Sequence, residues 1–269
     1  MPEGPETRII TDSLAKRLLN RNVISIDYLG GRYVKHGLPQ HSDVFTLTLP
    51  QEVEEVSCKG KFIYINFKNG WSLWNTLGMS GSWSDKHGKH SHVKITLDDG
   101  SSIFFNDPRR FGTLKYVKDR KETLDKLARI GPDMLAESIS DDLFGSRIML
   151  RSDKTIAEVL MDQSVISGVG NYLKSESLYF AKISPHRKCD TLQKDEIVRL
   201  NDVIKRVIRQ SYTSGGATIY TFQSFEGVKG QYTRRFAVYN QDKDPLGRDV
   251  KSFTSPGGRT TFWVPEEQI

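Results

Sequence analysis

The spacing of hydrophobic and polar positions changes along the chain and predicts distinct structural regions. Apolar residues recur near helical spacing over residues 6–19, which indicates a leading helix. Between residues 23 and 117 the pattern becomes a series of short apolar runs separated by turn signals such as Asp98-Asp99-Gly100. So many short strands indicate an antiparallel sandwich or barrel. The predicted strands are VISIDYL, VFTLTLP, KFIYINF, WSLWNTL, HVKITL, SIFFND and GTLKYV.

The second half of the chain changes to a helical pattern. A polar connection over about residues 118–140 leads into it. A Gly-, Thr- and Ser-rich stretch without a clear period, residues 213–235, is predicted to be a mobile loop. The end of the chain, residues 236–264, predicts a β-hairpin with FAVYN and TTFWV as its strands. The predicted helices span residues 141–150, 155–162, 171–182 and 191–212, and the last has one apolar stripe.

These elements predict an α+β multidomain protein. Its 269 residues, of which 37% are hydrophobic, are enough to build packed cores. We expect four parts: a β domain with a leading helix over residues 1–120, a linker over 121–140, a helical domain over 141–235 and a hairpin appendage over 236–269.

Composition restricts the setting in which the protein works. No apolar run approaches the roughly 18 residues of a transmembrane helix, and the N-terminus lacks the pattern of a secretory signal. The two cysteines, Cys58 and Cys189, lie too far apart in sequence to suggest a disulfide framework or a cysteine-rich zinc site. A reducing, intracellular environment is therefore expected.

The charge is basic and unevenly distributed. The net charge is +6 at pH 7, which suggests a polyanionic partner. Over residues 205–259 Lys and Arg outnumber the acids, and aromatic side chains are interleaved with them. The alternative is a solvated basic face.

The first six residues contain a candidate for covalent chemistry. The small side chain of Pro2 favours removal of Met1, which would leave a secondary amine at the N-terminus. An α-amino group has an ordinary pKa of about 7.7–8.0, so much of it is unprotonated near neutral pH and can act as a nucleophile. Glu3 and Glu6 place carboxylates beside it, where proton transfer would be needed. The alternative is an ordinary Pro-Glu helix start.

Two predicted turns have residues suited to nucleic acid. In Gly168-Val169-Gly170-Asn171, a helix start can present backbone N–H groups to an anion, with the Asn171 amide as a further donor. The alternative is a structural helix–turn–helix corner. In the turn DPRRFG, one arginine could bind phosphate while a second arginine and Phe111 insert into the base stack.

Two further positions have ordinary alternatives. Met79 lies in a strand-end turn, LGMSG, where core packing would equally explain it. Lys61 opens a predicted strand, where an isolated lysine is usually a surface charge.

Several motifs occur in one order over nearly the whole chain, and together they resemble the Fpg/Nei family of bifunctional DNA glycosylases/AP lyases. The Gly of MPEGPE and the NYL after the glycine turn are similar to the endonuclease VIII (Nei) side. DPRRFG is more similar to the formamidopyrimidine-DNA glycosylase side, or to animal endonuclease VIII-like enzymes. The matching stretches are MPEGPE, Lys61 in KGKFIYI, LGMSG, DPRRFG, MDQSVISGVGNYLKSESL and PGGRTTFW.

The resemblance implies catalytic roles for residues of the N-terminal region. Pro2 would attack C1′ of a damaged nucleotide, expel the base and form a Schiff base with the opened sugar. Glu3 would be the acid/base residue for sugar-ring opening or base departure, and Glu6 would support that site. Lys61 would contact a phosphate near the lesion and assist strand cleavage by β,δ-elimination.

The resemblance also implies how DNA would be held. It implies an N-terminal β-sandwich and a helix–two-turn–helix domain. In the latter, Asn171, beside Gly170, would bind the phosphates that flank the lesion. Arg259 on the hairpin would bind a further phosphate beside the flipped nucleotide. A mobile loop at about residues 216–235 would border the pocket for the flipped base. The void left by that nucleotide would be filled by Met79, Arg109 and Phe111.

The largest departure from the family pattern is in the hairpin. Most members close it around zinc with four cysteines, a tetrahedral set of thiolates. Here the matching positions hold no thiolate, which resembles a zincless finger, so we expect no zinc and no other cofactor. The matching positions are Leu246, Asp249, Val264 and Glu267. The hairpin would instead be held by apolar contacts of Leu246, Phe262, Trp263 and Val264.

The resemblance therefore implies a base-excision repair enzyme that removes oxidised bases, pyrimidine lesions and hydantoins before 8-oxoguanine. One alternative is a catalytically silent protein that binds damaged DNA. Another is mainly an AP lyase, with weak or 8-oxoguanine/formamidopyrimidine-directed excision. The expected partner is double-stranded DNA with oxidised bases or abasic sites, with single-stranded DNA as an alternative, and no membrane. We expect a monomer in whichever compartment keeps the DNA, nucleus or cytoplasm/nucleoid.

Overall fold

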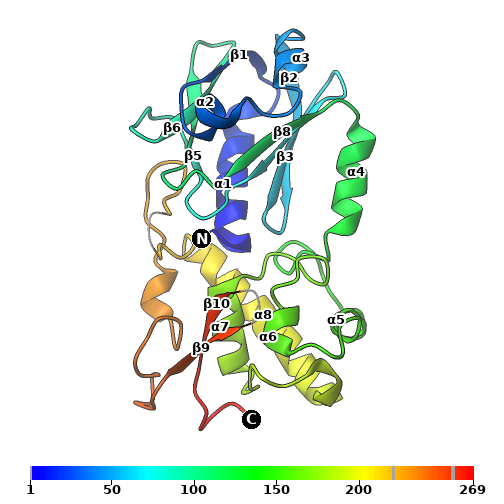
Figure 1. Cartoon of the computed structure of the whole chain (residues 1–269), viewed down its shortest axis with the longest axis vertical. Helices are drawn as coiled ribbons and strands as arrows, with labels where there is room; N and C mark the ends of the chain where they lie inside the picture. The colour runs from blue at the N-terminus through cyan, green and yellow to red at the C-terminus, as the bar shows by residue number, and fades with distance from the viewer. Residues whose placement is uncertain (1, 220–221, 256–257) are drawn as a thin grey trace. The chain divides into compact units, whose positions relative to one another are not determined.

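The computed structural model describes residues 2–219, 222–255 and 258–269. The chain forms two compact units, which are described separately (Figure 1). The first unit comprises residues 1–129 and 215–231, and the second comprises 130–214 and 232–269. Met1, residues 220–221 of the predicted loop and residues 256–257 of the predicted finger lie outside the described residues. Within the described ranges, no helix is both long and apolar enough to cross a membrane.

The first unit begins with the predicted leading helix, α1, Gly4–Leu18 (Figure 1). Its apolar residues Ile10, Leu14 and Leu18 are spaced four apart and are at most 1% exposed. This stripe lies on one face of the helix, which packs against the sheet strand β2. Burial of that face fixes the start of α1, and with it the N-terminal segment, on the sheet.

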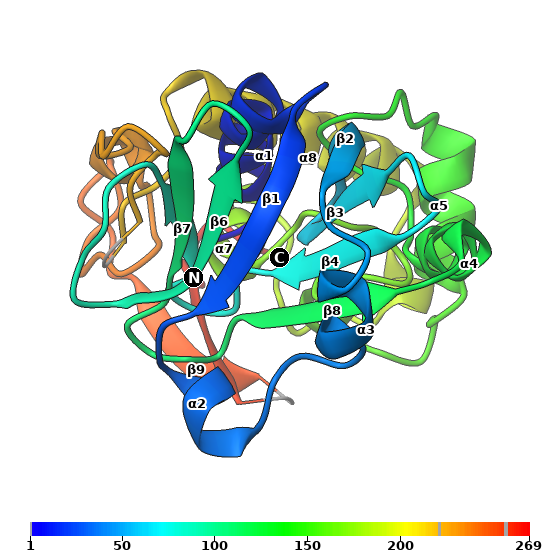
Figure 2. The same cartoon turned by 90° about the horizontal axis from the view of Figure 1, so that it is seen from above.

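Eight antiparallel strands form the sheet of the first unit, in the order β5-β7-β6-β1-β2-β3-β4-β8. The register between β1 and β2 covers two residue pairs, and two four-stranded halves meet there (Figure 2). Buried side chains of both halves belong to one hydrophobic core, which confirms the predicted antiparallel sandwich. The strands are β1 Asn22–Tyr28, β2 Gln51–Lys59, β3 Phe62–Phe67, β4 Ser72–Thr76, β5 Ser82–Ser84, β6 Ser91–Leu97, β7 Ser102–Asn106 and β8 Thr113–Val117.

The connection from β1 to β2 differs from the prediction. It contains two short helices, α2, Arg32–His36, and α3, Ser42–Thr46. The strand predicted at residues 44–50 is therefore wrong. Phe45 of α3 is fully buried and stacks on Tyr116 of β8 with ring centroids 4.8 Å apart. Anchoring of this ring in the core outweighs the β propensity of its β-branched neighbours.

Strand β2 does not appear among the strands predicted from the pattern. Its pairing with β3 shifts register between Val53 and Glu55, which marks a β-bulge. The buried residues Val53 and Cys58 are consequently an odd number of positions apart, so the period-2 pattern is broken. β5 was also missed, because three residues are too few to show a period.

The predicted polar linker contains a helix, α4, Arg120–Arg129, which belongs to the first unit. Thr123 is the residue of α4 that is buried, and its hydroxyl accepts a hydrogen bond from Trp74 Nε1 at 2.9 Å. A helix with so little buried surface has no apolar stripe, so its sequence is indistinguishable from a polar connection.

The second unit is helical, as predicted. α7, Asn171–Phe180, packs against both α8, Lys194–Thr213, and the strand β10, Arg259–Trp263. α8 has the clearest stripe, and Leu200, Ile204, Val207 and Ile208 on it are fully buried. The helices are α5 Asp141–Met149, α6 Ile156–Val159, α7 Asn171–Phe180 and α8 Lys194–Thr213, with 3₁₀ turns at Cys189–Thr191 and Tyr232–Arg235.

The C-terminal hairpin is present, but its first strand is not the predicted one. β9, Lys251–Ser255, pairs antiparallel with β10, Arg259–Trp263. The run FAVYN instead directs the backbone N–H groups of residues 237–239 to the buried carboxylate of Glu176 on α7, at 2.8–3.0 Å. Burial raises the pKa of Glu176, although these three N–H groups act against the shift. The backbone N–H groups of this stretch therefore donate to a carboxylate and not to a neighbouring strand.

Apolar packing holds the hairpin in part as predicted. Val264 is fully buried in a cluster with Tyr179 and Val238, and Phe262 packs against that cluster. Leu246 does not belong to it, because its side chain is 74% exposed. The prediction for Leu246 is wrong because residues 244–247 form a tight turn, closed by a 2.9 Å hydrogen bond from the Gly247 N–H to the Asp244 carbonyl.

A cluster of ion pairs also stabilises the hairpin region, residues 236–269, here called the finger. The guanidinium of Arg248 pairs with Asp244 at 2.7 Å and also with Glu267. Lys182 pairs with Glu267 at 2.7 Å, and the Tyr179 hydroxyl donates to Asp244 at 3.2 Å. Burial alone would raise the pKa of Asp244, but hydrogen bonds from Arg248 outweigh this effect, so the pKa of Asp244 is lowered. Contacts with Lys182 and Arg248 lower the pKa of Glu267.

These shifts predict an acid-sensitive finger. A lowered carboxyl pKa stabilises the fold above the ordinary values near 4 and loses that contribution as the pH falls through the folded-state value. We expect Arg248→Met to lower the melting temperature at pH 7, and the difference from wild type to shrink as the pH falls from about 4 towards 2. Thermal melts of both proteins across this range test it. A difference that stays constant with pH would contradict it.

Candidate functional site

The N-terminal segment is buried and held by reciprocal hydrogen bonds. Pro2 lies directly before Glu3, the N-cap of α1, and Pro2, Glu3 and Glu6 are all buried. The Glu3 side chain accepts the N–H of Glu6, and the Glu6 side chain accepts the N–H of Glu3 at 2.7 Å, which forms a capping box. The chain direction at Pro2 is thereby fixed by α1.

Glu6 also joins α1 to a segment more than 200 residues away. Its second carboxylate oxygen accepts the N–H of Ala217 at 2.7 Å. Phe222 and Phe225 belong to the core of the first unit, so residues 215–231 cluster with that unit and not with the helical domain in which the sequence placed them. Gly216 has a φ of +83°, and a Cβ there would lie 3.0 Å from Glu6 Oε1.

Glu6→Gln should loosen this junction. A glutamine has one carbonyl oxygen, so one of the two N–H groups would face an NH₂ and lose its acceptor, at a cost of about 1–3 kcal/mol. We expect lower stability in urea unfolding and faster proteolysis within residues 215–231. Glu226→Gln is the matched control, because Glu226 is an exposed residue of the same segment. Equal behaviour of the two variants would refute this role for Glu6.

Lys61 lies in the tight connection between β2 and β3, not inside the strand that the sequence predicted. Lys59 pairs with Phe62, so Gly60 and Lys61 form a two-residue turn, and Gly60 has a φ of +58°. Lys61 is half-buried. A turn of this kind holds the backbone of Lys61 rigidly at the end of the two strands.

The predicted void-filling residues lie on two turns that Asp107 joins. Asp107 is buried, accepts Ser80 Oγ of the first turn at 2.5 Å and accepts the Gly112 N–H of its own turn at 2.6 Å. The N–H of Arg109 in turn donates to Ser80 Oγ at 2.9 Å. Ser80 and Asp107 thus fix the turn that carries Met79 and the turn that carries Arg109.

The side chains on these turns differ in exposure. Phe111 is 55% exposed, and the Arg109 guanidinium lies 5.3 Å from its ring centroid. Met79 is half-buried. Gly78 permits the close approach of the two turns, because a Cβ there would lie 2.6 Å from the carbonyl carbon of Phe111. The structure brings the three predicted residues to one part of the first unit.

Three of the predicted phosphate-binding residues, Gly170, Asn171 and Arg259, lie in the second unit. Gly170 is the N-cap of α7 and supplies no side chain to cap the first N–H groups. Asn171 begins α7, and its Nδ2 donates to the carbonyl of Thr260 on β10 at 2.8 Å. Thr260 follows Arg259, which begins β10. The start of α7 and the start of β10 are therefore directly linked.

The finger residues do not fit a zinc ion. Of the four positions that match the family's cysteines, Leu246 is exposed and Val264 is buried in an apolar cluster. Asp249 pairs with Lys243, and Glu267 pairs with Arg248. Across the described part of the chain, no group of three or more His, Cys, Asp or Glu side chains could hold a metal ion.

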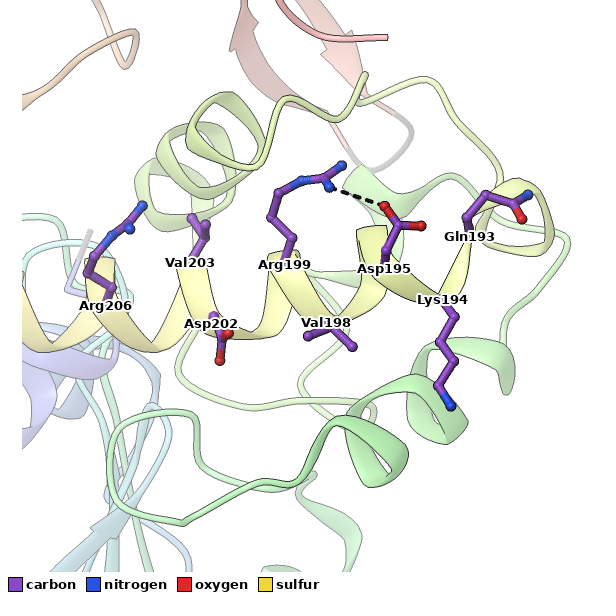
Figure 3. Close-up of a pocket in the computed structure, with 8 residues that line it drawn as sticks. All are labelled: Gln193, Lys194, Asp195, Val198, Arg199, Asp202, Val203 and Arg206. Atoms are coloured by element: carbon purple, nitrogen blue, oxygen red, sulfur yellow. Dashed lines mark hydrogen bonds and ion pairs between the residues drawn. The ribbon is translucent and has the colours of Figure 1, made fainter.

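A shallow hollow is present on the second unit. It runs along α8, where Asp195 and Arg199 form an ion pair at 3.4 Å (Figure 3). None of the candidate catalytic, phosphate-binding or void-filling residues lines it. Its lining residues are Gln193, Lys194, Asp195, Val198, Arg199, Asp202, Val203 and Arg206.

Two known domain families match the chain. Residues 1–114 match the formamidopyrimidine-DNA glycosylase N-terminal domain, and residues 130–223 match the formamidopyrimidine-DNA glycosylase H2TH domain. The formamidopyrimidine-DNA glycosylase of Roseiflexus sp. (strain RS-1) is 30% identical over 276 residues, which covers 100% of both chains.

Solved structures agree with these matches. The MutM (Fpg) protein of Thermus thermophilus superposes with a TM-score of 0.86 at 26% identity, covering 99% of this chain and 98% of that one. The Lactococcus lactis Fpg in complex with DNA containing an abasic site has a TM-score of 0.85 at 25% identity and covers 99% of both chains. The chain therefore belongs to the formamidopyrimidine-DNA glycosylase family, and it is a DNA-binding repair enzyme, a bifunctional DNA glycosylase and AP lyase.

Proposed function

We propose that this glycosylase removes oxidised bases, preferably pyrimidine lesions and hydantoins, through a Schiff base on Pro2 after removal of Met1. The observation that supports the proposal most is the placement of Pro2 directly before the buried N-cap Glu3, on a helix anchored in the core. A nucleophile on a fixed element, with a carboxylate on the next residue, has the arrangement that covalent catalysis needs.

The proposed reaction divides one difficult step into easier ones. The lone pair of the Pro2 nitrogen forms a bond to C1′, and the bond from C1′ to the base breaks. Glu3 moves the proton needed for base departure or ring opening. Once the nitrogen has lost its proton, its lone pair expels O4′ from C1′, which opens the sugar ring and leaves O4′ as a hydroxyl. Because the amine of proline is secondary, the product is a cationic iminium, which accepts electrons as β- and then δ-elimination cleave the strand. Lys61, fixed in its turn, is proposed to contact a phosphate near the lesion and assist these steps.

Asn171, Gly170 and Arg259 are proposed to bind phosphates of the damaged strand. The N-terminus of α7 lacks a side-chain cap, and helix N-termini attract anions through unsatisfied N–H groups and the helix dipole. The hydrogen bond from Asn171 to the residue after Arg259 supports one phosphate site built from both elements. Met79, Arg109 and Phe111 are proposed to fill the void of the flipped nucleotide, and their shared position on two linked turns supports this.

We also propose that the finger works without zinc, held by its apolar cluster and by the pairs that Arg248 forms. In this arrangement the chain divides functionally at about residues 120 and 140, with residues 216–235 bordering the base pocket and residues 236–269 as the finger. The protein is proposed to act as a monomer wherever DNA is kept.

The lesion preference is open to a direct comparison. A second candidate, formamidopyrimidine and 8-oxoguanine excision, is favoured by the name of the Roseiflexus relative. Single-turnover excision from matched duplexes with thymine glycol, 5-hydroxyuracil, a hydantoin, 8-oxoguanine or formamidopyrimidine separates the two. We expect pyrimidine lesions and hydantoins to be removed faster. Faster removal of 8-oxoguanine would support the second candidate, and cleavage of abasic sites alone would indicate mainly an AP lyase.

A further inference from the structure

Lys174 is a lysine buried inside the second unit, on α7 one turn after Asn171. It is 0% exposed. Its Nζ donates to Asn171 Oδ1 at 2.9 Å and to Thr261 Oγ1 on β10 at 2.7 Å. Removing a charged group from water is costly unless hydrogen bonds compensate, and here two of them go to the start of α7 and to the hairpin. Lys174 therefore joins the two elements that carry the proposed phosphate ligands.

The bonds to Lys174 and to the Thr260 carbonyl together determine which way the Asn171 amide faces. An ammonium group can only donate, so the amide must turn its oxygen towards Lys174 and its NH₂ away from it. One N–H of that NH₂ donates to the Thr260 carbonyl at 2.8 Å. The second N–H is the donor that we assign to phosphate. Without Lys174, the amide oxygen would lose its donor, and the Thr260 carbonyl alone would oppose rotation of the amide away from the orientation that suits a phosphate.

The charge of Lys174 points to an anion as well. Lys174 lies in the first turn of α7, where the positive end of the helix dipole disfavours a cation. An anion bound at the same helix end would interact favourably with both the dipole and the ammonium. A lysine at this place is thus suited to a helix that works with a phosphate at its N-terminus.

We propose that Lys174 is a positioning residue of the DNA site: it orients the Asn171 amide and ties β10 to α7, so that Asn171 and Arg259 bind phosphates together. This inference rests on the proposed phosphate role of Asn171. Lys174 itself is buried beneath the site, and it acts through Asn171 and Thr261.

The test uses the full chain and a duplex with a tetrahydrofuran abasic analogue, which cannot form a Schiff base. Lys174→Met keeps the length of the side chain and removes the charge and the donor. We expect the dissociation constant to rise roughly tenfold, as for the loss of one charged hydrogen bond. On a cleavable abasic duplex at saturating concentration, the single-turnover rate should stay within about twofold of wild type, since bound DNA still meets Pro2. The active fraction from borohydride trapping corrects for misfolded protein.

Two further variants make the test specific. Lys174→Arg keeps a cationic donor and should restore most of the affinity. Lys205→Met is the matched control, because it removes one charge and a partly buried hydrogen bond, from Nζ to the Ile139 carbonyl at 2.6 Å, elsewhere in the second unit. Its affinity should stay near that of wild type.

A double-mutant cycle with Asn171→Leu decides how Lys174 acts. If Lys174 works through Asn171, Lys174→Met should cost little further affinity in the Asn171→Leu background. Additive losses would overturn the proposal, as would unchanged affinity in Lys174→Met when Asn171→Leu binds weakly. Unchanged affinity in Asn171→Leu itself would refute the phosphate role of Asn171, and the positioning role with it.

Discussion

Pro2→Gly is expected to slow cleavage of an abasic-site duplex at least about 10³-fold and to reduce the yield of the borohydride-trapped adduct strongly. Glycine would leave a primary amine, whose imine must gain a proton before it accepts electrons, whereas the iminium of proline is always cationic. Glycine also lacks the ring that restricts the backbone before the N-cap of α1. Single-turnover cleavage and trapping of both proteins measure the loss.

The matched control is Pro5→Ala. Pro5 lies in the first turn of the same helix, so the change removes a proline from the same segment without altering the N-terminal amine. We expect near wild-type cleavage for Pro5→Ala. An N-terminal extension that blocks the Pro2 nitrogen should be as inactive as Pro2→Gly. Comparable cleavage by Pro2→Gly and wild type would exclude Pro2 as the nucleophile.

Glu3→Gln is expected to lower base excision by about 10²- to 10⁴-fold, the contribution of a positioned acid or base. Glutamine can still accept the Glu6 N–H through its carbonyl oxygen, so the capping box and the start of α1 should persist. It cannot transfer a proton. The loss should therefore appear in the chemical step and not in DNA affinity or thermal stability.

An abasic duplex separates the possible roles of Glu3. It has no base to release, and part of its sugar is already open as the aldehyde, so Glu3→Gln should cleave it with a much smaller loss. Parallel single-turnover assays on a damaged-base duplex and an abasic duplex give the two ratios. Equal losses on both substrates would place Glu3 in the elimination steps, and no loss on either would remove it from the chemistry.

Local patterns predicted most of the elements of this fold. The leading helix, the sandwich and the helices of the second unit follow from regular periods, such as the stripe of buried residues on α8. Predictions failed where tertiary contacts decide the local structure. The bulge at Val53 breaks the alternating pattern by which β2 would have been recognised. Burial of the Phe45 ring favours the helix α3 over the strand that the sequence predicted. The backbone of FAVYN donates to the Glu176 carboxylate, so this run does not pair within the hairpin.

The candidate site, like the fold, could be predicted only in part from local sequence. Its residues stand out in the sequence because they lie in short motifs, such as MPEGPE and DPRRFG. The contacts that hold them in place cannot be identified from the motifs, because the partner residues are remote in sequence. Glu6 accepts the N–H of Ala217, and Lys174 donates to Thr261. The glycines offered a signal, since Gly78 and Gly216 both have a positive φ where chains approach closely.

A trapped covalent adduct locates the nucleophile directly. The enzyme is incubated with an abasic duplex and borohydride, digested with nuclease and trypsin, and analysed by mass spectrometry. Trypsin cleaves after Arg8, so the N-terminal peptide is residues 2–8 once Met1 is removed. We expect the reduced sugar remnant on this peptide, at the Pro2 nitrogen. A remnant on the peptide that contains Lys61, or on any other lysine, would contradict it.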